Sequence, residues 1–169
     1  MDRIIVEWLG EFVAAHGPFR RVLELGSLDV NGTPRAAFVG TSEYVGVDAR
    51  EGPGVDVVMD TSMLWHWSQM KKFDCVVATS FFEHDRAFWK TLPGIHEHLK
   101  QGGWFVLTVP TLDFPVHEYP GDYYRFTAQA VREVLMEGLH GVELFNPLWQ
   151  HPPESPHLKC QHMGAYGRA

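Results

Sequence analysis

Segments with the apolar spacing of a helix alternate along the chain with segments whose apolar pattern is typical of strands. Residues 2–15 carry apolar side chains at the spacing of one helix face, whereas 21–26 and 44–48 are short, dense apolar runs typical of buried strands. The helical pattern breaks at Gly17-Pro18. The pattern predicts an N-terminal helix over 2–15, strands over 21–26 and 44–48, and a short helix over 33–38 between them.

The same alternation continues through the middle of the chain. It predicts strands over 55–60, 73–79 and 103–109, and helices over 62–70 and 86–99, with Gly102 and Gly103 ending the second helix. Repeated strand–helix units indicate an α/β fold with a mostly parallel sheet, helices on both faces and right-handed crossovers. Binding residues are then expected at the edge where the strands end.

The C-terminal third is less regular. A loop rich in Pro, His, Asp and Tyr runs to about residue 126, and a helix is predicted from Thr127 to about Met136. Strand-like patterns cover 141–146 and 161–167, and the segment from Pro147 to Lys159 has too many prolines for a regular strand. No repeat or composition shift divides the chain, so residues 1–169 are predicted to form one domain.

Charge and composition narrow the range of partners. The net charge of -7 opposes attraction to phosphate backbones and anionic membrane surfaces, so nucleic acid is a poor candidate acceptor. No apolar run reaches the roughly 20 residues that span a bilayer, and the N-terminus lacks the features of a signal peptide. Two cysteines, Cys75 and Cys160, do not suggest a disulfide framework. We expect a cytoplasmic protein without a membrane span.

Two buried strands carry carboxylates near their ends. Asp48 follows Gly26 at about the spacing at which an acidic residue holds a ribose hydroxyl pair in nucleotide-binding sheets. A dinucleotide would require glycine at Leu28, and Glu24 would repel a diphosphate. A nucleotide-binding oxidoreductase is therefore the weaker alternative, and a ligand with a sulfonium and an ammonium group, such as S-adenosylmethionine, suits these charges better.

The order and spacing of several segments resemble the class I S-adenosylmethionine-dependent methyltransferases, within them the small bacterial methyltransferase-domain group (type 11-like). The resemblance covers nearly the whole chain and rests on residues 22–32, 44–48, 52–60, 73–77 with Glu83-His84, 102–110 and 119–127. It implies a Rossmann-like three-layer sandwich whose seven-stranded, mostly parallel sheet ends in an antiparallel hairpin. It also implies S-adenosylmethionine as cofactor and S-adenosylhomocysteine as product.

The resemblance assigns cofactor roles to the first three strand ends. Glu24 would accept the ammonium group, and the backbone of Gly26 and Ser27 would lie against the methionine portion. Asp48 would accept both ribose hydroxyls. The other residues predicted to bind the cofactor here are Asp29, in the same loop as Gly26, and Asp60 with Thr61, beside the adenine. A structural partner for Glu24 and helix-capping roles for Asp48 and Asp60 are the alternatives.

Residues after the fourth strand are expected to line both cofactor and substrate, namely Thr79, Ser80, Phe81 and His84. Phe81 would cover the adenine or face the sulfonium, or else belong to the core. Glu83-His84 resembles a family pair just below the active site. We interpret His84 as lining the cofactor pocket rather than as a base.

The segment 117–127 concentrates imidazole, carboxylate, phenol and guanidinium groups beyond the fifth strand. His117 and Asp122 are the candidate bases, and Arg125 with Tyr123 or Tyr124 would orient the acceptor. His117, Asp122 and Arg125 are thus the predicted catalytic residues, and His117, Tyr123, Tyr124 and Arg125 the predicted substrate residues. In the alternative, Asp122 and Arg125 simply pair to fix the loop.

No metal site is predicted from the sequence, because His151, His157, Cys160 and His162 lack the tight cysteine pairs of common zinc sites. The sequence predicts methyl transfer to an oxygen or nitrogen of a small-molecule or a sugar- or lipid-linked acceptor. Little chain is left for an acceptor lid, so the pocket would either be open or be completed by a second copy of the chain or a partner protein. A non-catalytic S-adenosylmethionine-binding partner or sensor module is the alternative.

Overall fold

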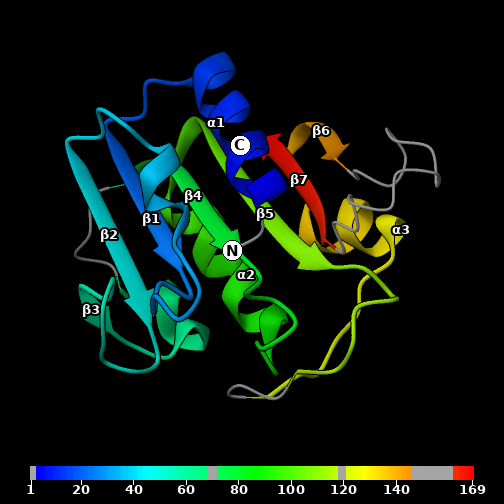
Figure 1. The fold of residues 1–169 in the computed structure, drawn as a ribbon. Helices are drawn as coiled ribbons and strands as arrows, with labels where there is room; N and C mark the ends of the chain where they lie inside the picture. The colour runs from blue at the N-terminus through cyan, green and yellow to red at the C-terminus, as the bar shows by residue number, and fades with distance from the viewer. Residues whose placement is uncertain (1–2, 68–71, 118–120, 146–161) are drawn as a thin grey trace.

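A computed structural model describes residues 3–67, 72–117, 121–145 and 162–169 (Figure 1). Helical and strand elements alternate through most of the chain. In order they are α1 (Arg3–His16), β1 (Arg21–Leu25), η1 (Pro34–Ala37), β2 (Glu43–Asp48), β3 (Val57–Val58), η2 (Thr61–His66), β4 (Phe73–Thr79), α2 (Phe88–His98), β5 (Leu99–Pro110), α3 (Ala128–Ala130), η3 (Val131–Leu135), β6 (His140–Phe145) and β7 (His162–Arg168).

The strands form one seven-stranded sheet in the order β3-β2-β1-β4-β5-β7-β6. Strands β1 to β5 pair in parallel, whereas β7 runs antiparallel to both β5 and β6. The predicted mostly parallel sheet with an antiparallel C-terminal pair is confirmed. Because the first strands run in one direction, β1, β2 and β4 all end at the lower edge of the sheet in Figure 1.

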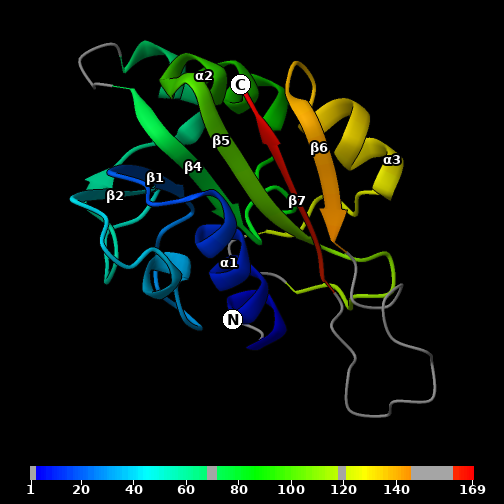
Figure 2. The same ribbon diagram turned by 90° about the horizontal axis from the view of Figure 1, so that it is seen from above.

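Helices cover both faces of the sheet, as predicted (Figure 2). On one face, Ile5, Leu9 and Phe12 of α1 pack with the side chains of Val22 and Val77. On the other face, α2, η2 and η3 pack on a second cluster of strand residues that includes Leu23, Leu25, Val76 and Phe105. Neighbouring residues of one strand contribute to different clusters because successive side chains point to opposite faces.

Among the predicted elements that differ from the structure are three in the middle of the chain. The strand expected over 55–60 is reduced to Val57–Val58. The helix expected over 62–70 is a 3₁₀ helix that begins at Thr61 and ends at His66. Asp60 explains part of this difference, because its side chain accepts the N–H of Ser62 and so begins the helix directly after the short strand.

The third difference concerns the glycine pair. Strand β5 begins at Leu99, so Gly102 and Gly103 lie inside the strand and do not end a helix. Gly102 has a φ of +74°, which favours glycine, and its N–H donates to the carbonyl of Ala169 at 2.7 Å. The glycines therefore bend the strand where the C-terminus passes.

Among the residues that the structure describes, no helix has the length and apolar character required to cross a membrane.

Candidate functional site

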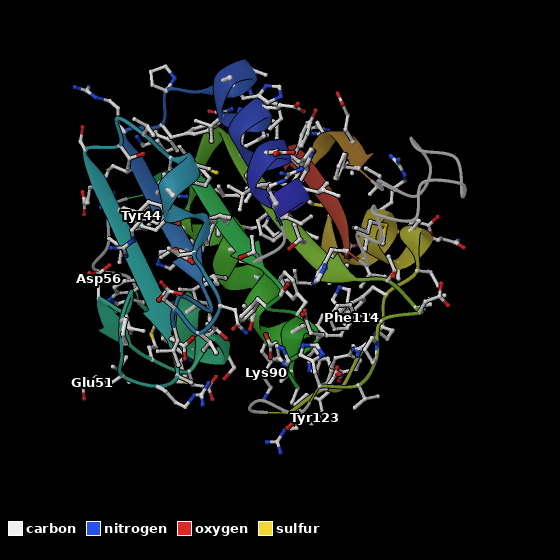
Figure 3. The ribbon with its side chains drawn as sticks, in the orientation of Figure 1. Tyr44, Glu51, Asp56, Lys90, Phe114 and Tyr123 are labelled. Atoms are coloured by element: carbon white, nitrogen blue, oxygen red, sulfur yellow. The ribbon has the colours of Figure 1, made fainter. Side chains whose placement is uncertain are left out.

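A cavity of about 1070 Å³ lies at the edge where β1, β2 and β4 end. Most of the predicted site residues line it: Glu24, Gly26, Ser27, Asp48, Asp60, Thr61, Thr79, Ser80, Phe81, His84, His117 and Tyr123. Asp29, Asp122, Tyr124 and Arg125 do not. Figure 3 shows Lys90, Phe114 and Tyr123, which also line the cavity, gathered near this edge.

Glu24 brings a buried carboxyl group to the cavity wall, with only 2% of the residue exposed. Its Oε1 accepts a long hydrogen bond of 3.5 Å from Thr33, and its Oε2 has no hydrogen-bond partner among the described residues. Burial raises the pKa of Glu24 to about 8, against the opposing effects of the Tyr44 hydroxyl and the Arg35 guanidinium. A cation in the cavity would favour the ionised form, so this carboxyl is suited to bind a positively charged group.

The loop after β1 turns at Gly26, whose φ is +72°. A Cβ atom at this position would lie 2.8 Å from the ring of Phe81, so the backbone and the aromatic ring touch. Leu28 occupies the position where dinucleotide-binding loops have glycine. Its side chain packs against Gly52, where a Cβ atom would come within 2.3 Å of Leu28 Cδ1. The loop therefore accommodates leucine by packing it on a neighbouring glycine.

Asp48 connects this loop to the end of β2. Its Oδ2 accepts the N–H of Leu28 at 3.2 Å, and its Oδ1 accepts the N–H of Arg50 at 3.0 Å. The carboxylate thus fixes two backbone segments while it lines the cavity. Each carboxylate oxygen can accept more than one hydrogen bond, so these contacts are compatible with a pair of ribose hydroxyls.

Asp60 and Asp29 have different positions. Asp60 lines the cavity and also caps η2, because its Oδ1 accepts the N–H of Ser62 at 2.9 Å. The hydrogen bond from the Ser62 hydroxyl, followed by this backbone hydrogen bond, lowers the pKa of Asp60. Asp29 is exposed outside the cavity, and its Oδ1 accepts the N–H of Gly32 at 2.8 Å. The structure therefore brings Asp60, but not Asp29, to the cavity with the other predicted residues.

The segment after β4 crosses the centre of the cavity edge. Ser80 has a φ of 48°, an uncommon value for a residue with a side chain, and its N–H donates to the carbonyl of Thr108 at 2.9 Å. His84 Nδ1 makes a short hydrogen bond with the carbonyl of Gly121, and its Nε2 lies 3.9 Å from Oε1 of Glu83. Burial lowers the pKa of His84, so the ring is neutral near pH 7 with its Nε2 unprotonated.

Asp122 and Arg125, both in the segment 117–127, form an ion pair that is largely shielded from solvent. Their side chains are 2% and 17% exposed, and Arg125 Nη2 donates to Oδ2 of Asp122 at 2.6 Å. Asp122 also accepts the backbone N–H of His117 at 2.8 Å, and Arg125 donates to the carbonyls of Phe114 and Pro115. The hydrogen bonds from Arg125 hold the pKa of Asp122 well below its usual range. This is the loop-fixing arrangement that the sequence left as an alternative.

Two other predicted substrate residues are separated. Tyr123 is 51% exposed and lines the cavity, whereas the hydroxyl of Tyr124 donates to the carbonyl of Arg86 at 3.0 Å and the residue lies outside the cavity. His117 lines the cavity, and its Nδ1 lies 3.2 Å from Oδ2 of Asp122. In the segment 117–127, His117 and Tyr123 therefore line the cavity, whereas Asp122, Tyr124 and Arg125 lie outside it.

Sequence reasoning missed several residues of the cavity wall, among them Arg50, Asp85, Arg86, Lys90 and Phe114. Asp85 accepts the N–H of Ala87 and the hydroxyl of Thr91, so it organises the start of α2. The sequence held a signal for Asp85, Arg86 and Lys90, because residues 85–90 directly follow the Glu83-His84 pair after a predicted strand. His162 also lines the cavity, whereas His151, His157 and Cys160 lie outside the described residues.

The profile of a methyltransferase domain family matches residues 1–152. No curated protein matches the sequence.

Among the solved structures, the chain is similar to an S-adenosylmethionine-dependent methyltransferase from Archaeoglobus fulgidus, with 17% identity, a TM-score of 0.66, and 98% of this chain and 93% of the other covered. It is similar to Burkholderia thailandensis 1,6-didemethyltoxoflavin-N1-methyltransferase with bound 1,6-didemethyltoxoflavin and S-adenosylhomocysteine, with 18% identity, a TM-score of 0.66, and 99% and 79% covered. The third is the N-terminal domain of EvdMO1 in the presence of S-adenosylhomocysteine and D-fucose, with 19% identity, a TM-score of 0.65, and 99% and 84% covered. At these identities the likeness concerns the fold.

Proposed function

Because the chain belongs to the methyltransferase domain family, we propose that it transfers a methyl group to an oxygen or nitrogen atom of a small-molecule or a sugar- or lipid-linked acceptor. The family match confirms the predictions of an S-adenosylmethionine-dependent methyltransferase and of S-adenosylmethionine as its cofactor. It also favours the enzyme over the non-catalytic binding module.

The observation that carries the proposal is the distribution of chemistry around one cavity. Glu24 and Asp48 lie at the ends of β1 and β2, and His117 and Tyr123 belong to the loop beyond β5. We assign the strand-end carboxylates to the cofactor, with Glu24 on its ammonium group and Asp48 on its ribose hydroxyls. The cofactor would then lie between these strands and the loop.

The acceptor side is small and partly aromatic. Phe114 packs its ring edge against His117, with the ring centroids 5.1 Å apart, and Tyr123 provides an exposed phenol. This wall suits a compact acceptor with a ring and polar substituents. One of the similar structures has 1,6-didemethyltoxoflavin bound and another was determined in the presence of D-fucose, which supports a small acceptor here.

Methyl transfer requires the acceptor atom to approach the methyl carbon in line with the carbon–sulfur bond, so positioning supplies much of the rate. The acceptor also loses a proton. Of the three predicted catalytic residues, only His117 lines the cavity. Asp122 lies outside it and is hydrogen-bonded to Arg125. His117 would then act on the acceptor directly, as a base.

The first test is calorimetric titration of S-adenosylmethionine and S-adenosylhomocysteine into wild type and Asp48→Ala. We expect the substitution to weaken binding by about tenfold or more, because hydrogen bonds to a charged group contribute about 1.5–3 kcal/mol each. Glu51→Ala is the matched control, since Glu51 is an exposed acidic residue near the same strand end and does not line the cavity (Figure 3).

An acceptor screen follows with amino sugars, deoxy sugars and nitrogen heterocycles, each assayed for S-adenosylhomocysteine release and for a methylated product by mass spectrometry. A product from one of these classes would support the proposed acceptor. Unchanged cofactor affinity in Asp48→Ala would contradict the assigned binding mode, and methylation of nucleic acid alone would contradict the acceptor class.

A further inference from the structure

Glu83 is the most unusual charged residue of the acceptor side. Its side chain is fully buried, and neither carboxylate oxygen has a hydrogen-bond partner among the described residues. Burying a carboxyl group without a partner is costly, so such a group in a native fold requires an explanation. The nearby Arg125 does not supply one, because its guanidinium is already paired with Asp122.

Two imidazoles stand next to this carboxyl group. Ligand-type atoms of Glu83, His84 and His117 all lie within 4.8 Å of one another. The rings of the two histidines meet edge to face with their centroids 4.7 Å apart, and both line the cavity. The three residues come from two segments, the turn after β4 and the loop after β5, so the fold brings them together.

Each imidazole has an oxygen atom next to its Nδ1. In His84 this atom is the carbonyl oxygen of Gly121, and in His117 it is Oδ2 of Asp122 at 3.2 Å. Histidines that bind metals commonly have such an oxygen partner on the second ring nitrogen, which fixes the ring and leaves the other nitrogen unprotonated. His84 therefore has the surroundings of a metal-binding histidine, whereas Nδ1 of His117 lies near the Asp122 carboxylate without forming a hydrogen bond.

We propose that Glu83, His84 and His117 bind a divalent metal ion of the zinc class on the acceptor side of the cavity. Two imidazole nitrogens and one carboxylate oxygen are a donor set that zinc uses in catalytic sites, where a fourth position stays open. Ligand atoms around one tetrahedral zinc ion lie roughly 3.3 Å apart. The 3.9 Å between His84 Nε2 and Glu83 Oε1 needs only a small side-chain adjustment to reach that separation.

The charges of the surroundings also favour a cation. Asp122 and Arg125 compensate each other, and both histidines are neutral ligands when a metal is bound, so an ionised Glu83 leaves one negative charge at the site. A divalent ion would provide the partner that both buried carboxylate oxygens lack.

The ion also specifies the acceptor, and this step rests on the proposed function. A hydroxyl oxygen of the acceptor would occupy the open position, where the positive charge favours loss of its proton to solvent. A lone pair of that oxygen then forms the new bond to the methyl carbon. The carbon–sulfur bond breaks, and its electron pair stays on sulfur, which gives neutral S-adenosylhomocysteine. The metal route thus selects an oxygen acceptor over a nitrogen acceptor.

The test is titration of Zn²⁺, and separately of Co²⁺, into the chelator-treated 169-residue chain without cofactor or acceptor. We expect one ion per chain, with visible Co²⁺ absorption typical of low coordination number. His117→Ala and the near-isosteric Glu83→Gln should weaken binding by about tenfold or more. Circular dichroism and the melting temperature establish that each variant is folded.

Matched controls separate this site from other histidines. His140→Ala removes an exposed imidazole at the start of β6 and should leave metal affinity unchanged. The double substitution His157→Ala with Cys160→Ser removes two of the four other histidines and cysteines considered from the sequence, and it should also have no effect. Absence of a bound ion, or full retention of binding in His117→Ala, would overturn the proposal.

The metal site and the proposed function can fail separately. Cofactor binding and methylation by metal-free protein would leave the proposed function standing and exclude the metal route. Tight metal binding at these residues without turnover on any acceptor would retain the metal site and count against the acceptor class.

Discussion

Two buried carboxyl groups, one from each side of the cavity, are held in different ways. On the cofactor side, the Glu24 carboxyl is buried at the end of a rigid strand with one long hydrogen bond. On the acceptor side, the Asp122 carboxylate is also buried but accepts hydrogen bonds from Arg125 and His117. The contrast teaches that a buried carboxyl left without partners is a candidate for a ligand, whereas a fully paired one holds the chain in place.

The largest expected effect comes from breaking the ion pair of Asp122 and Arg125. Arg125→Ala leaves Asp122 buried without its cation, and removal of one partner of a buried pair costs about 3 kcal/mol of unfolding free energy. Urea denaturation measures this loss. Arg3→Ala is the control, because Arg3 and Glu7 form an exposed pair whose contribution is below about 0.5 kcal/mol. Equal losses in the two variants would refute the distinction between the pairs.

The next effect concerns the carboxyl group of Glu24. Because the pKa of Glu24 is raised to about 8, the carboxyl is mostly protonated in the free protein at pH 7 and must ionise to hold an ammonium group. The affinity for S-adenosylmethionine should rise by roughly tenfold per pH unit between about pH 5.5 and 7, where α-amino groups with pKa values near 8 stay charged. Calorimetry at several pH values measures this slope.

Glu24→Gln gives the control for this slope, because the amide does not titrate, and its affinity should vary little with pH. Stability without ligand has the opposite sign. Since the folded pKa of Glu24 lies above the unfolded value of 4.5, its contribution is fully present below about pH 4.5 and is lost as pH rises toward 8. A wild-type affinity that is flat across this range would show that Glu24 does not hold the ammonium.

The smallest expected effect sharpens the boundary of the cofactor side. Asp29→Ala removes an exposed carboxylate that lies outside the cavity and accepts one backbone N–H, from Gly32. We expect cofactor affinity to change by less than about twofold, and stability by about 0.5–1.5 kcal/mol from the lost hydrogen bond. A larger loss of affinity would place Asp29 in the binding site after all.

Several elements were predictable because their signals are local. Strand β4 has the predicted bounds, and β1 and β2 differ from prediction by one residue at one end, since dense apolar runs bounded by polar turns permit little else. The carboxylates Glu24 and Asp48 were placed at the cavity for the same reason. Parallel strands end at one edge, so residues at strand ends meet there whatever the loops do.

Other features depend on contacts between distant segments. The glycine pair at 102–103 has the appearance of a helix end, but the carbonyl of Ala169 holds it inside β5. Asp122 was a candidate base from the sequence, but its carboxylate accepts hydrogen bonds from Arg125 and from the backbone N–H of His117. The sequence offered the pair of Asp122 and Arg125 only as an alternative and gave no signal for the Ala169 carbonyl, because a loop of this length has many ways to pair its charges.

By itself the sequence determined the order of strands and helices, the edge at which the site lies and the family to which the chain belongs. Each of these follows from local periodicity, or from motifs whose spacing is fixed by one strand and its turn. Only the tertiary structure decided which charges are paired and which are left for a ligand. The meeting of Glu83 and His84 with His117 is the clearest case, because it depends on how two loops from different strands pack above the same sheet edge.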